Sequence, residues 1–398
     1  MAQPAELASG LAPFAIRGRL VVDGGLFPGV VVVRDGAIAE IVRDPAGADL
    51  PGDVLDAHIV APGLIDLQVN GAFGVEVGED ADAIRHLSQQ LPATGVTAFL
   101  PTVVSSTASF YAGVREAFMQ ARDADGAVPL GLHVEGPFLS ARRAGAHRLS
   151  AIENAPPDLY ERGLLEGEVV RMVTLAPETD GALDRIRRLR ERGIVVSLGH
   201  TDATYEEFVR GIDHGASLVT HLYSAMSAFR HRSPGAVGAA LVDDRVTAGI
   251  IADGVHCHPA SLRLALKTKG VERIALVTDA IAGAGMAPGT YRLEGQEILV
   301  EETGARLADG TLAGSVLTLD QAVRNMVRLG GARVADAIRM ASDVPARVLG
   351  LSRQGRLAVG FDADLVLLDE GLEVQATFRR GRQQFSRDAR GPARAAGA

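Results

Sequence analysis

The sequence predicts an α/β protein: a (β/α)8 TIM-like barrel with a small β-sandwich domain built from both ends of the chain. Two observations predict it. Eight apolar runs of strand length recur between residues 59 and 277, most of them separated by helical patterns, and eight βα units in about 290 residues are typical of this barrel. Strand-like alternating segments also lie at both ends of the chain, outside that repeat.

The two terminal segments are expected to form one β domain. Residues 14–42 read as a meander of short strands, with Asp35-Gly36 as a hairpin turn, and alternating runs recur at 365–368 and 374–378. Neither segment is large enough to bury a core alone, so we expect them to pair. The predicted domains are a split sandwich, residues 1–60 and 352–398, around a barrel at 61–351. The tail after about residue 390, rich in Ala, Gly, Pro and Arg, is expected to be disordered.

The barrel strands are expected at 59–69, 96–103, 130–134, 169–175, 194–198, 218–219, 246–252 and 274–277. Helical patterns lie between most of them. One apolar helix face ends at Gly193, and Thr204 with Glu207 forms a capping-box signal for a helix ending near Gly215. A doubly wound sheet is the alternative, but it does not predict polar residues at so many strand ends.

Polar side chains follow these predicted strands where each one ends, and in a barrel those ends meet at one mouth. They are Gln68 and Asn70, His133 and Glu135, His200, His221, Asp253 with His256, and Asp279. Each alone has a plain explanation as a helix cap or a buried hydrogen bond. Their joint placement favours an active site.

Glu135, His200 and His221 together offer one carboxylate oxygen and two imidazole nitrogens, a set suited to zinc with an open position for water. A bound metal lowers the pKa of such a water to about 7. Asp279 is then the candidate that accepts the water's proton and passes it to a leaving amine. The sequence therefore predicts metal-dependent hydrolysis of an amide-like bond.

Other possible sites are weaker. His256-Cys257-His258 resembles a ligand cluster, but in a strand Cys257 would face away from its two neighbours, and Pro259 begins a helix. Gly283-Ala284-Gly285 lacks the strand–helix frame of a dinucleotide site and is predicted to be a turn. His58, His86 and His214 lie away from the strand ends, where we expect structural or solvated roles.

Composition narrows the function classes. A formal net charge of -9 argues against non-specific nucleic-acid binding. Cys257 is the single cysteine, which excludes an internal disulfide and a cysteine-rich metal site. Neither a signal-peptide pattern nor an apolar run of about 18 residues is present, so we expect a cytoplasmic protein without a membrane span.

These motifs occur in the order found in the amidohydrolase superfamily, and they resemble most closely those of the N-acetylglucosamine-6-phosphate deacetylases within it. The matching segments span nearly the whole chain. They are Pro62-Gly63-Leu64-Ile65-Asp66, Gly131 to Phe138, Gly145-Ala146-His147, Gly199 to Ala203, Thr220 to Tyr223, Ala252 to His256, and Val277-Thr278-Asp279-Ala280.

The resemblance implies removal of the acetyl group from N-acetylglucosamine-6-phosphate by an attacking, metal-activated water. Glu135, His200 and His221 would bind the metal, Asp279 would be the acid/base, and His147 would polarise the acetyl carbonyl. Residues implied to contact substrate are His256, Ser224, Ala225, Arg143, Gly314 and Arg232. Arg232 matches a phosphate-binding arginine that family members lend from the partner subunit, which implies a homodimer.

Two departures from the wider pattern stand out. Many superfamily members have His-x-His at the end of strand one, which holds a second metal. This chain has Gln68-Val69-Asn70 at that position, as in single-metal members of the family. The resemblance therefore implies one divalent ion per subunit. Zn²⁺ is expected, with Fe²⁺ or another divalent ion as the alternative. Ser224 stands where the family usually has asparagine beside the phosphate.

Rival hypotheses remain. A deacetylase for another N-acyl amino sugar, such as the galactosamine 6-phosphate or an unphosphorylated compound, would share the metal site and differ around Arg232 and Ser224. A cyclic amidase usually needs a carbamylated lysine at a strand end, whereas both lysines here, Lys267 and Lys269, lie in a predicted helix. A non-catalytic scaffold should have lost a ligand or the acid, and neither is missing.

Overall fold

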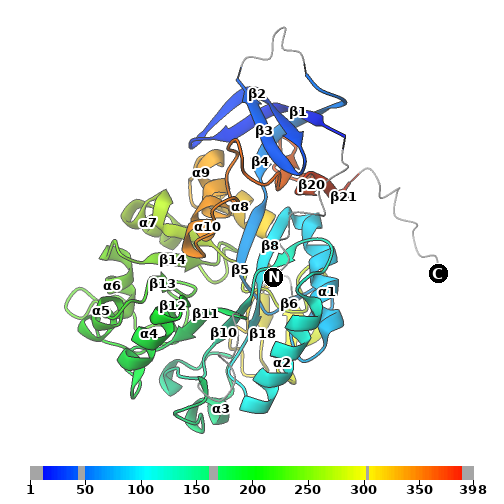
Figure 1. Cartoon of the computed structure of the whole chain (residues 1–398). Coiled ribbons are helices and arrows are strands. Elements are labelled where there is room, and N and C mark those ends of the chain that lie inside the picture. The colour runs from blue at the N-terminus through cyan, green and yellow to red at the C-terminus, as the bar shows by residue number, and fades with distance from the viewer. Residues whose placement is uncertain (1–11, 44–49, 161–168, 302–303, 388–398) are drawn as a thin grey trace.

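The computed structural model describes residues 12–43, 50–160, 169–301 and 304–387. Strands from both ends of the chain form one sheet beside a parallel barrel, so the predicted fold class is confirmed (Figure 1). The expected disordered tail lies outside the described residues. The predicted domain boundaries at residues 60/61 and 351/352 stay a prediction.

The terminal sheet has seven strands in the order β21-β20-β19-β4-β1-β2-β3. Their bounds are β1 (Phe14–Val22), β2 (Gly25–Arg34), β3 (Ala37–Val42), β4 (Val54–Pro62), β19 (Leu365–Leu368), β20 (Val374–Arg379) and β21 (Arg382–Ser386). The sheet bends back on itself, because the edge strand β3 also bonds to the segment ahead of β19: Ile38 N–H donates to Phe361 O at 2.8 Å. The bend encloses a small core that includes Ile16, Val31 and Leu365.

The barrel strands run parallel in the order β15-β14-β13-β12-β11-β10-β8-β5. They are β5 (Leu64–Val69), β8 (Val96–Val103), β10 (Leu132–Glu135), β11 (Val170–Leu175), β12 (Val195–Leu198), β13 (Leu218–Val219), β14 (Thr247–Ile250) and β15 (Ile274–Leu276), with β9 (Val128–Pro129) beside β8. The barrel closes at its carboxyl end, where Asn70 N–H donates to Ala280 O at 2.8 Å and Asp279 N–H to Gln68 O at 3.0 Å. The closing seam therefore passes through the candidate site.

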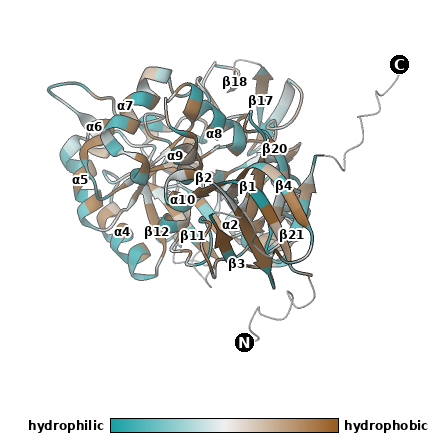
Figure 2. Ribbon diagram, turned by 90° about the horizontal axis from the view of Figure 1, so that it is seen from above, coloured by the Kyte–Doolittle hydropathy of each residue, from teal (hydrophilic) through white to brown (hydrophobic). Residues whose placement is uncertain are grey.

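Helices surround the barrel, and α4 and α5 at its periphery carry hydrophilic residues on their outer side (Figure 2). They are α1 (Ala81–Gln90), α2 (Ala108–Ala121), α3 (Leu149–Glu153), α4 (Ala182–Glu191), α5 (Tyr205–Asp213), α6 (Gly235–Val242), α7 (Pro259–Lys269), α8 (Leu319–Arg328), α9 (Val334–Met340) and α10 (Asp343–Val348), with the 3-10 turns η1 (Leu91–Thr94), η2 (Ala141–Arg143) and η4 (Val271–Arg273). The predicted capping box at Thr204 and Glu207 is present on α5, and Gly193 follows α4 in a left-handed conformation. None of the helices among the described residues is both long and apolar enough to cross a bilayer.

The structure corrects two sequence-based expectations. The run 59–69 is not one strand: β4 ends at Pro62 in the terminal sheet and β5 begins at Leu64 in the barrel. Between them lies Gly63, where a Cβ atom would meet the Thr97 side chain at 2.3 Å. Residues 256–258 are not in a strand either, because β14 ends at Ile250; His258 instead accepts a bond from Ala260 N–H and caps α7.

The sequence reasoning also missed an antiparallel insertion after barrel strand eight. It consists of β16 (Gly289–Leu293), β17 (Gln296–Glu301) and β18 (Gly304–Arg306), drawn in yellow in Figure 1. A second short hairpin, β6 (Gly71–Ala72) and β7 (Val75–Glu76), follows β5. Residues 283–285 lie in a turn ahead of the insertion, as predicted.

Candidate functional site

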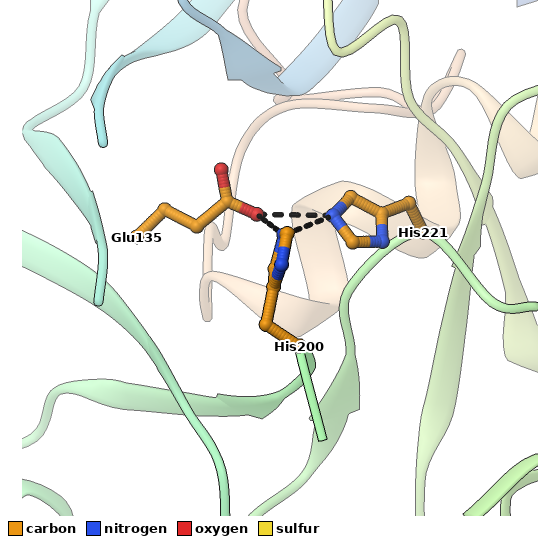
Figure 3. A group of neighbouring side chains, drawn as sticks. All are labelled: Glu135, His200 and His221. Carbon is orange, nitrogen blue, oxygen red and sulfur yellow. Dashed lines mark hydrogen bonds and ion pairs between the residues drawn. The ribbon is translucent and has the colours of Figure 1, made fainter. Parts of the chain in front are cut away.

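Three side chains from the ends of three barrel strands point at one another at the carboxyl end of the barrel (Figure 3). Glu135 ends β10, His200 follows β12 and His221 follows β13. Glu135 Oε1 lies 3.0 Å from His221 Nε2 and 3.3 Å from His200 Nε2, and the two Nε2 atoms are 3.1 Å apart. All three residues are buried. Among the described residues, these three side chains form the group whose possible ligand atoms lie close enough together, all within 4.8 Å of one another, to hold a metal ion.

The donor set fits a divalent cation. Ligand atoms around a tetrahedral ion with bonds of about 2.1 Å lie about 3.4 Å apart, close to the separations seen here. His200 Nδ1 donates to the backbone carbonyl of Arg143 at 2.8 Å, which leaves the Nε2 lone pair of neutral His200 free to bind a metal. His221 Nδ1 is buried and makes no hydrogen bond among the described residues.

The charges in the cluster are coupled. Burial disfavours the carboxylate of Glu135, but its hydrogen bonds and charge interactions with His200 and His221 outweigh burial and hold the pKa well below the usual range. Burial lowers the pKa of His221, yet the bond and negative charge of Glu135 raise it overall to about 8. A proton therefore competes with a cation for His221.

Asp279 lies beside the cluster and is held by two amides. Gln68 Nε2 donates to Asp279 Oδ1 at 3.0 Å and to Glu135 Oε2 at 3.1 Å, and Asn70 Nδ2 donates to Asp279 Oδ1 at 2.7 Å. Burial and the nearby charge of Glu135 raise the pKa of Asp279 to about 6. The side chain is thus suited to exchange a proton near neutral pH.

His147 lies in the loop after β10, with its ring centroid 4.4 Å from that of His200. The backbone N–H of Ser105 donates to His147 Nδ1 at 3.1 Å. Because that N–H can only donate, neutral His147 carries its proton on Nε2, which lies 3.8 Å from Glu135 Oε2. Burial and the charge of His200 lower the pKa of His147 to about 3, so the ring stays neutral and presents an N–H donor to the site.

His256 is oriented by a carboxylate on its own loop. Its Nδ1 lies 2.7 Å from Asp253 Oδ2, and its backbone N–H donates to Asp253 Oδ1 at 2.8 Å. Burial opposes ionisation of Asp253, but its bonds and charge interaction with His256 lower its pKa overall. Because Asp253 Oδ2 accepts from Nδ1–H, the Nε2 atom is an acceptor for a hydroxyl group whenever the ring is neutral.

These side chains line one cavity of about 440 Å³. Ten of the eleven residues singled out from the sequence line it: Glu135, Arg143, His147, His200, His221, Ser224, Ala225, His256, Asp279 and Gly314. Arg232 does not line the cavity; it lies in an exposed segment, residues 228–233, ahead of α6. The structure thus brings together all eleven of these residues except Arg232, whereas His133, also noted as a strand end, contacts Thr174 Oγ1 at 2.8 Å and does not line the cavity.

The cavity also contains residues that the sequence reasoning did not select. They are Val104, Arg142, Gly145, Ala146, Tyr223, Leu293, Thr311 and Leu312, with Asn70 noted earlier only as a strand end. Several adjoin the motifs, so a wider reading of those segments would have included them. Leu293, Thr311 and Leu312 lie within or after the β16–β18 insertion, for which the βα pattern carries no signal.

Comparisons with known proteins extend over most of the chain. The amidohydrolase family model matches residues 59–386. A relative called N-acetylglucosamine-6-phosphate deacetylase, from Lysinibacillus sphaericus, is 36% identical over 88% of this chain and 92% of its own length. A relative from Escherichia coli O157:H7, called N-acetylgalactosamine-6-phosphate deacetylase, is 39% identical over 92% of this chain and 97% of its own.

A solved structure is similar over an equally large part of the chain. It is a variant of the N-acetyl-D-glucosamine-6-phosphate deacetylase from Mycobacterium smegmatis in complex with N-acetyl-D-glucosamine-6-phosphate. It is 34% identical, covers 94% of this chain and 100% of its own, and has a TM-score of 0.87.

Proposed function

Because this chain belongs to the amidohydrolase family, we propose that it removes the acetyl group from N-acetylglucosamine-6-phosphate, giving glucosamine-6-phosphate and acetate. One observation carries the proposal: a buried two-histidine, one-carboxylate cluster shares a cavity floor with a carboxyl group of raised pKa and a neutral histidine that presents an N–H. Relatives that bear the name of this reaction, similar over most of their length, support the substrate.

The family and the cluster indicate a divalent cation, and we propose one Zn²⁺ per subunit held by Glu135, His200 and His221. When bound, such a cation is a Lewis acid that lowers the pKa of water to about 7. Gln68 supports a single ion, because its amide nitrogen lies between the carboxylates of Glu135 and Asp279 and bonds to both. The amide N–H groups of Gln68 already donate to Glu135 Oε2 and Asp279 Oδ1, the two carboxylate oxygens that a second cation would need as ligands.

The chain's own groups divide the reaction between them. His147 donates its Nε2–H to the acetyl carbonyl oxygen and stabilises the negative charge that develops there. Asp279 accepts a proton from the attacking water and delivers it to the amide nitrogen as the carbon–nitrogen bond breaks. Gln68 and Asn70 hold the Asp279 carboxylate in place during both transfers.

We propose that the sugar occupies the remainder of the cavity. His256 Nε2 accepts a hydrogen bond from a sugar hydroxyl, and Arg143, Ser224, Ala225 and Gly314 complete the contacts. Arg143 is held by Asp202, with 2.7 Å between Arg143 Nη2 and Asp202 Oδ1. Asp202 follows His200 by two residues, so this ion pair ties the sugar end of the cavity to the metal end.

We further propose a homodimer in which Arg232 of one subunit binds the phosphate in the partner's cavity. Its position supports this, since Arg232 lies outside the cavity of its own subunit in an exposed segment. The neighbouring Phe229 is 57% exposed, an apolar side chain that an interface would cover.

The test is a coupled assay of acetate release from N-acetylglucosamine-6-phosphate, its galactosamine epimer and the two unphosphorylated sugars. We expect the highest kcat/KM for the glucosamine 6-phosphate. A higher value for the galactosamine epimer would change the assigned sugar and leave the hydrolysis intact. Protein that carries its metal and releases acetate from none of the four would contradict the proposed function.

A further inference from the structure

The active-site cavity has an apolar wall formed by Val104 and Leu293. Both side chains are nearly buried, 7% and 5% exposed, and both line the cavity. The same two residues and Asn70 also line a small void on the other side of the wall, which does not admit a water molecule. The wall therefore separates the active site from a narrow space with no room for a group the size of water.

Leu293 ends β16, and the turn that follows is attached at three points. Gln296 Nε2 donates to Ala146 O at 2.9 Å, Arg148 donates to the backbone carbonyl of Glu294, and Glu294 N–H donates to the Glu76 carboxylate. Leu293 itself packs in a core cluster with Ile281, Ile298 and Val300. The side chain is thus held firmly against the cavity.

This wall stands beside the groups assigned to the amide. Val104 precedes Ser105, whose N–H donates to His147, and Ala146, which anchors the hairpin, directly precedes His147. Asn70, which adjoins the wall in both spaces, donates to Asp279. The carbonyl carbon of the substrate carries two substituents, the sugar nitrogen and the acyl chain. Polar residues such as His256 and Arg143 can form hydrogen bonds with the hydroxyl groups of the sugar. The methyl group of the acyl chain cannot form hydrogen bonds and is expected to pack against an apolar wall.

We propose that Leu293, with Val104, sets the length of the acyl chain that the enzyme accepts. This inference rests on the proposed deacetylation. An acetyl methyl group contacts the wall, whereas a propionyl or butyryl chain must push Leu293 aside or enter a void that does not admit even a water molecule. The hairpin of the β16–β18 insertion is thus a specificity element of the site.

The test compares kcat/KM for N-acetyl-, N-propionyl- and N-butyrylglucosamine-6-phosphate in wild type and in Leu293→Ala. A single methylene typically changes discrimination by about 10–200-fold, so wild type should lose at least about tenfold from acetyl to propionyl. Leu293→Ala should raise the propionyl-to-acetyl ratio at least about tenfold, because the shortened side chain opens the void to the longer chain. The propionyl-to-acetyl ratio does not depend on the fraction of the enzyme that is active, because both substrates are measured on the same preparation. Leu293→Val is a milder variant to use if Leu293→Ala fails to fold.

Leu299→Ala is the matched control. Leu299 lies on β17 of the same insertion, is 52% exposed and does not line the cavity, so its propionyl-to-acetyl ratio should equal that of wild type. An equal change in Leu299→Ala, an unchanged ratio in Leu293→Ala, or a wild type indifferent to chain length would overturn the inference. If acetate is released from some other N-acetyl compound, the proposed substrate fails, and the acyl series on that compound still decides the role of Leu293.

Discussion

The substitution Asp279→Asn separates proton transfer from metal binding. In wild type, Asp279 Oδ1 accepts from the amides of Gln68 and Asn70. An asparagine of the same shape keeps an oxygen for both donors, so the side chain should stay in place. It cannot accept a proton from water, and this is the one function that the variant loses.

The magnitude follows from that single loss. General acid–base catalysis is typically worth about 10²- to 10⁴-fold in rate, so kcat should fall by at least about 100-fold, or about 2.7 kcal/mol of activation free energy. KM should change little, because Asp279 contacts the reacting atoms and not the sugar. Metal content should stay near that of wild type, since the proposed ligands are Glu135, His200 and His221.

The assay is acetate release with elemental analysis of the same preparation, over a range of pH. The proton acceptor must be ionised, so wild-type kcat/KM should decline as the pH falls through the pKa of Asp279, about 6 without the cation and lower with it. Asp364→Asn is the matched control, because burial also raises the pKa of Asp364 to about 6, and Asp364 directly precedes β19 of the terminal sheet and does not line the cavity. If Asp279→Asn loses its metal in parallel with its activity, Asp279 is a ligand and the assignment is wrong.

Three further predictions concern the metal, the carbonyl and the phosphate. Elemental analysis of protein purified without added metal should find about one equivalent per subunit, and two tightly held equivalents would contradict the role given to Gln68. His147→Ala should lower kcat by about 10²- to 10³-fold with metal content unchanged, as expected for loss of one donor to a developing oxyanion; a normal kcat would remove His147 from the mechanism. Arg232→Ala should lower kcat/KM at least tens-fold for the phosphorylated sugar, since a desolvated charge contact is worth about 2–5 kcal/mol, and should leave the unphosphorylated sugar nearly unaffected. Equal effects on both sugars would reject phosphate recognition by Arg232.

The sequence was sufficient to predict the barrel because its strands are buried on both faces and therefore form mostly apolar runs. All six residues of β5 are buried, and so are all eight of β8. The sequence was not sufficient to predict the residue at which the chain leaves the terminal sheet and enters the barrel. The residues next to Gly63, 59–62 before it and 64–65 after it, are all apolar, and only the close approach to Thr97 shows why the run divides there.

Placement of the candidate site was predictable for a topological reason. Parallel strands bring their carboxyl ends to one mouth, so residues as far apart in sequence as Gln68 and Asp279 were expected to meet, and a hydrogen bond of 3.0 Å joins them. The contribution of Leu293 was not predictable, because it reaches the cavity from an antiparallel insertion. Residues of β16 alternate between partly buried and exposed and end at Leu293, its one buried residue, and nothing in that pattern indicates a neighbouring active site.

Several residues that line the cavity have a left-handed backbone conformation. Eleven described residues other than glycine have positive φ, and five of them line the cavity: His200, His221, Tyr223, Ala225 and Asp279. Such conformations cost about 1–3 kcal/mol each and persist only where the surrounding structure holds them. Asp279 is held on both sides, since its N–H donates to Gln68 O and its carbonyl accepts from Ser315 N–H. Asparagine and aspartate tolerate this left-handed conformation better than most residues. The same geometry that positions the carboxylate therefore also lets Asp279→Asn remove its charge without disturbing the barrel seam.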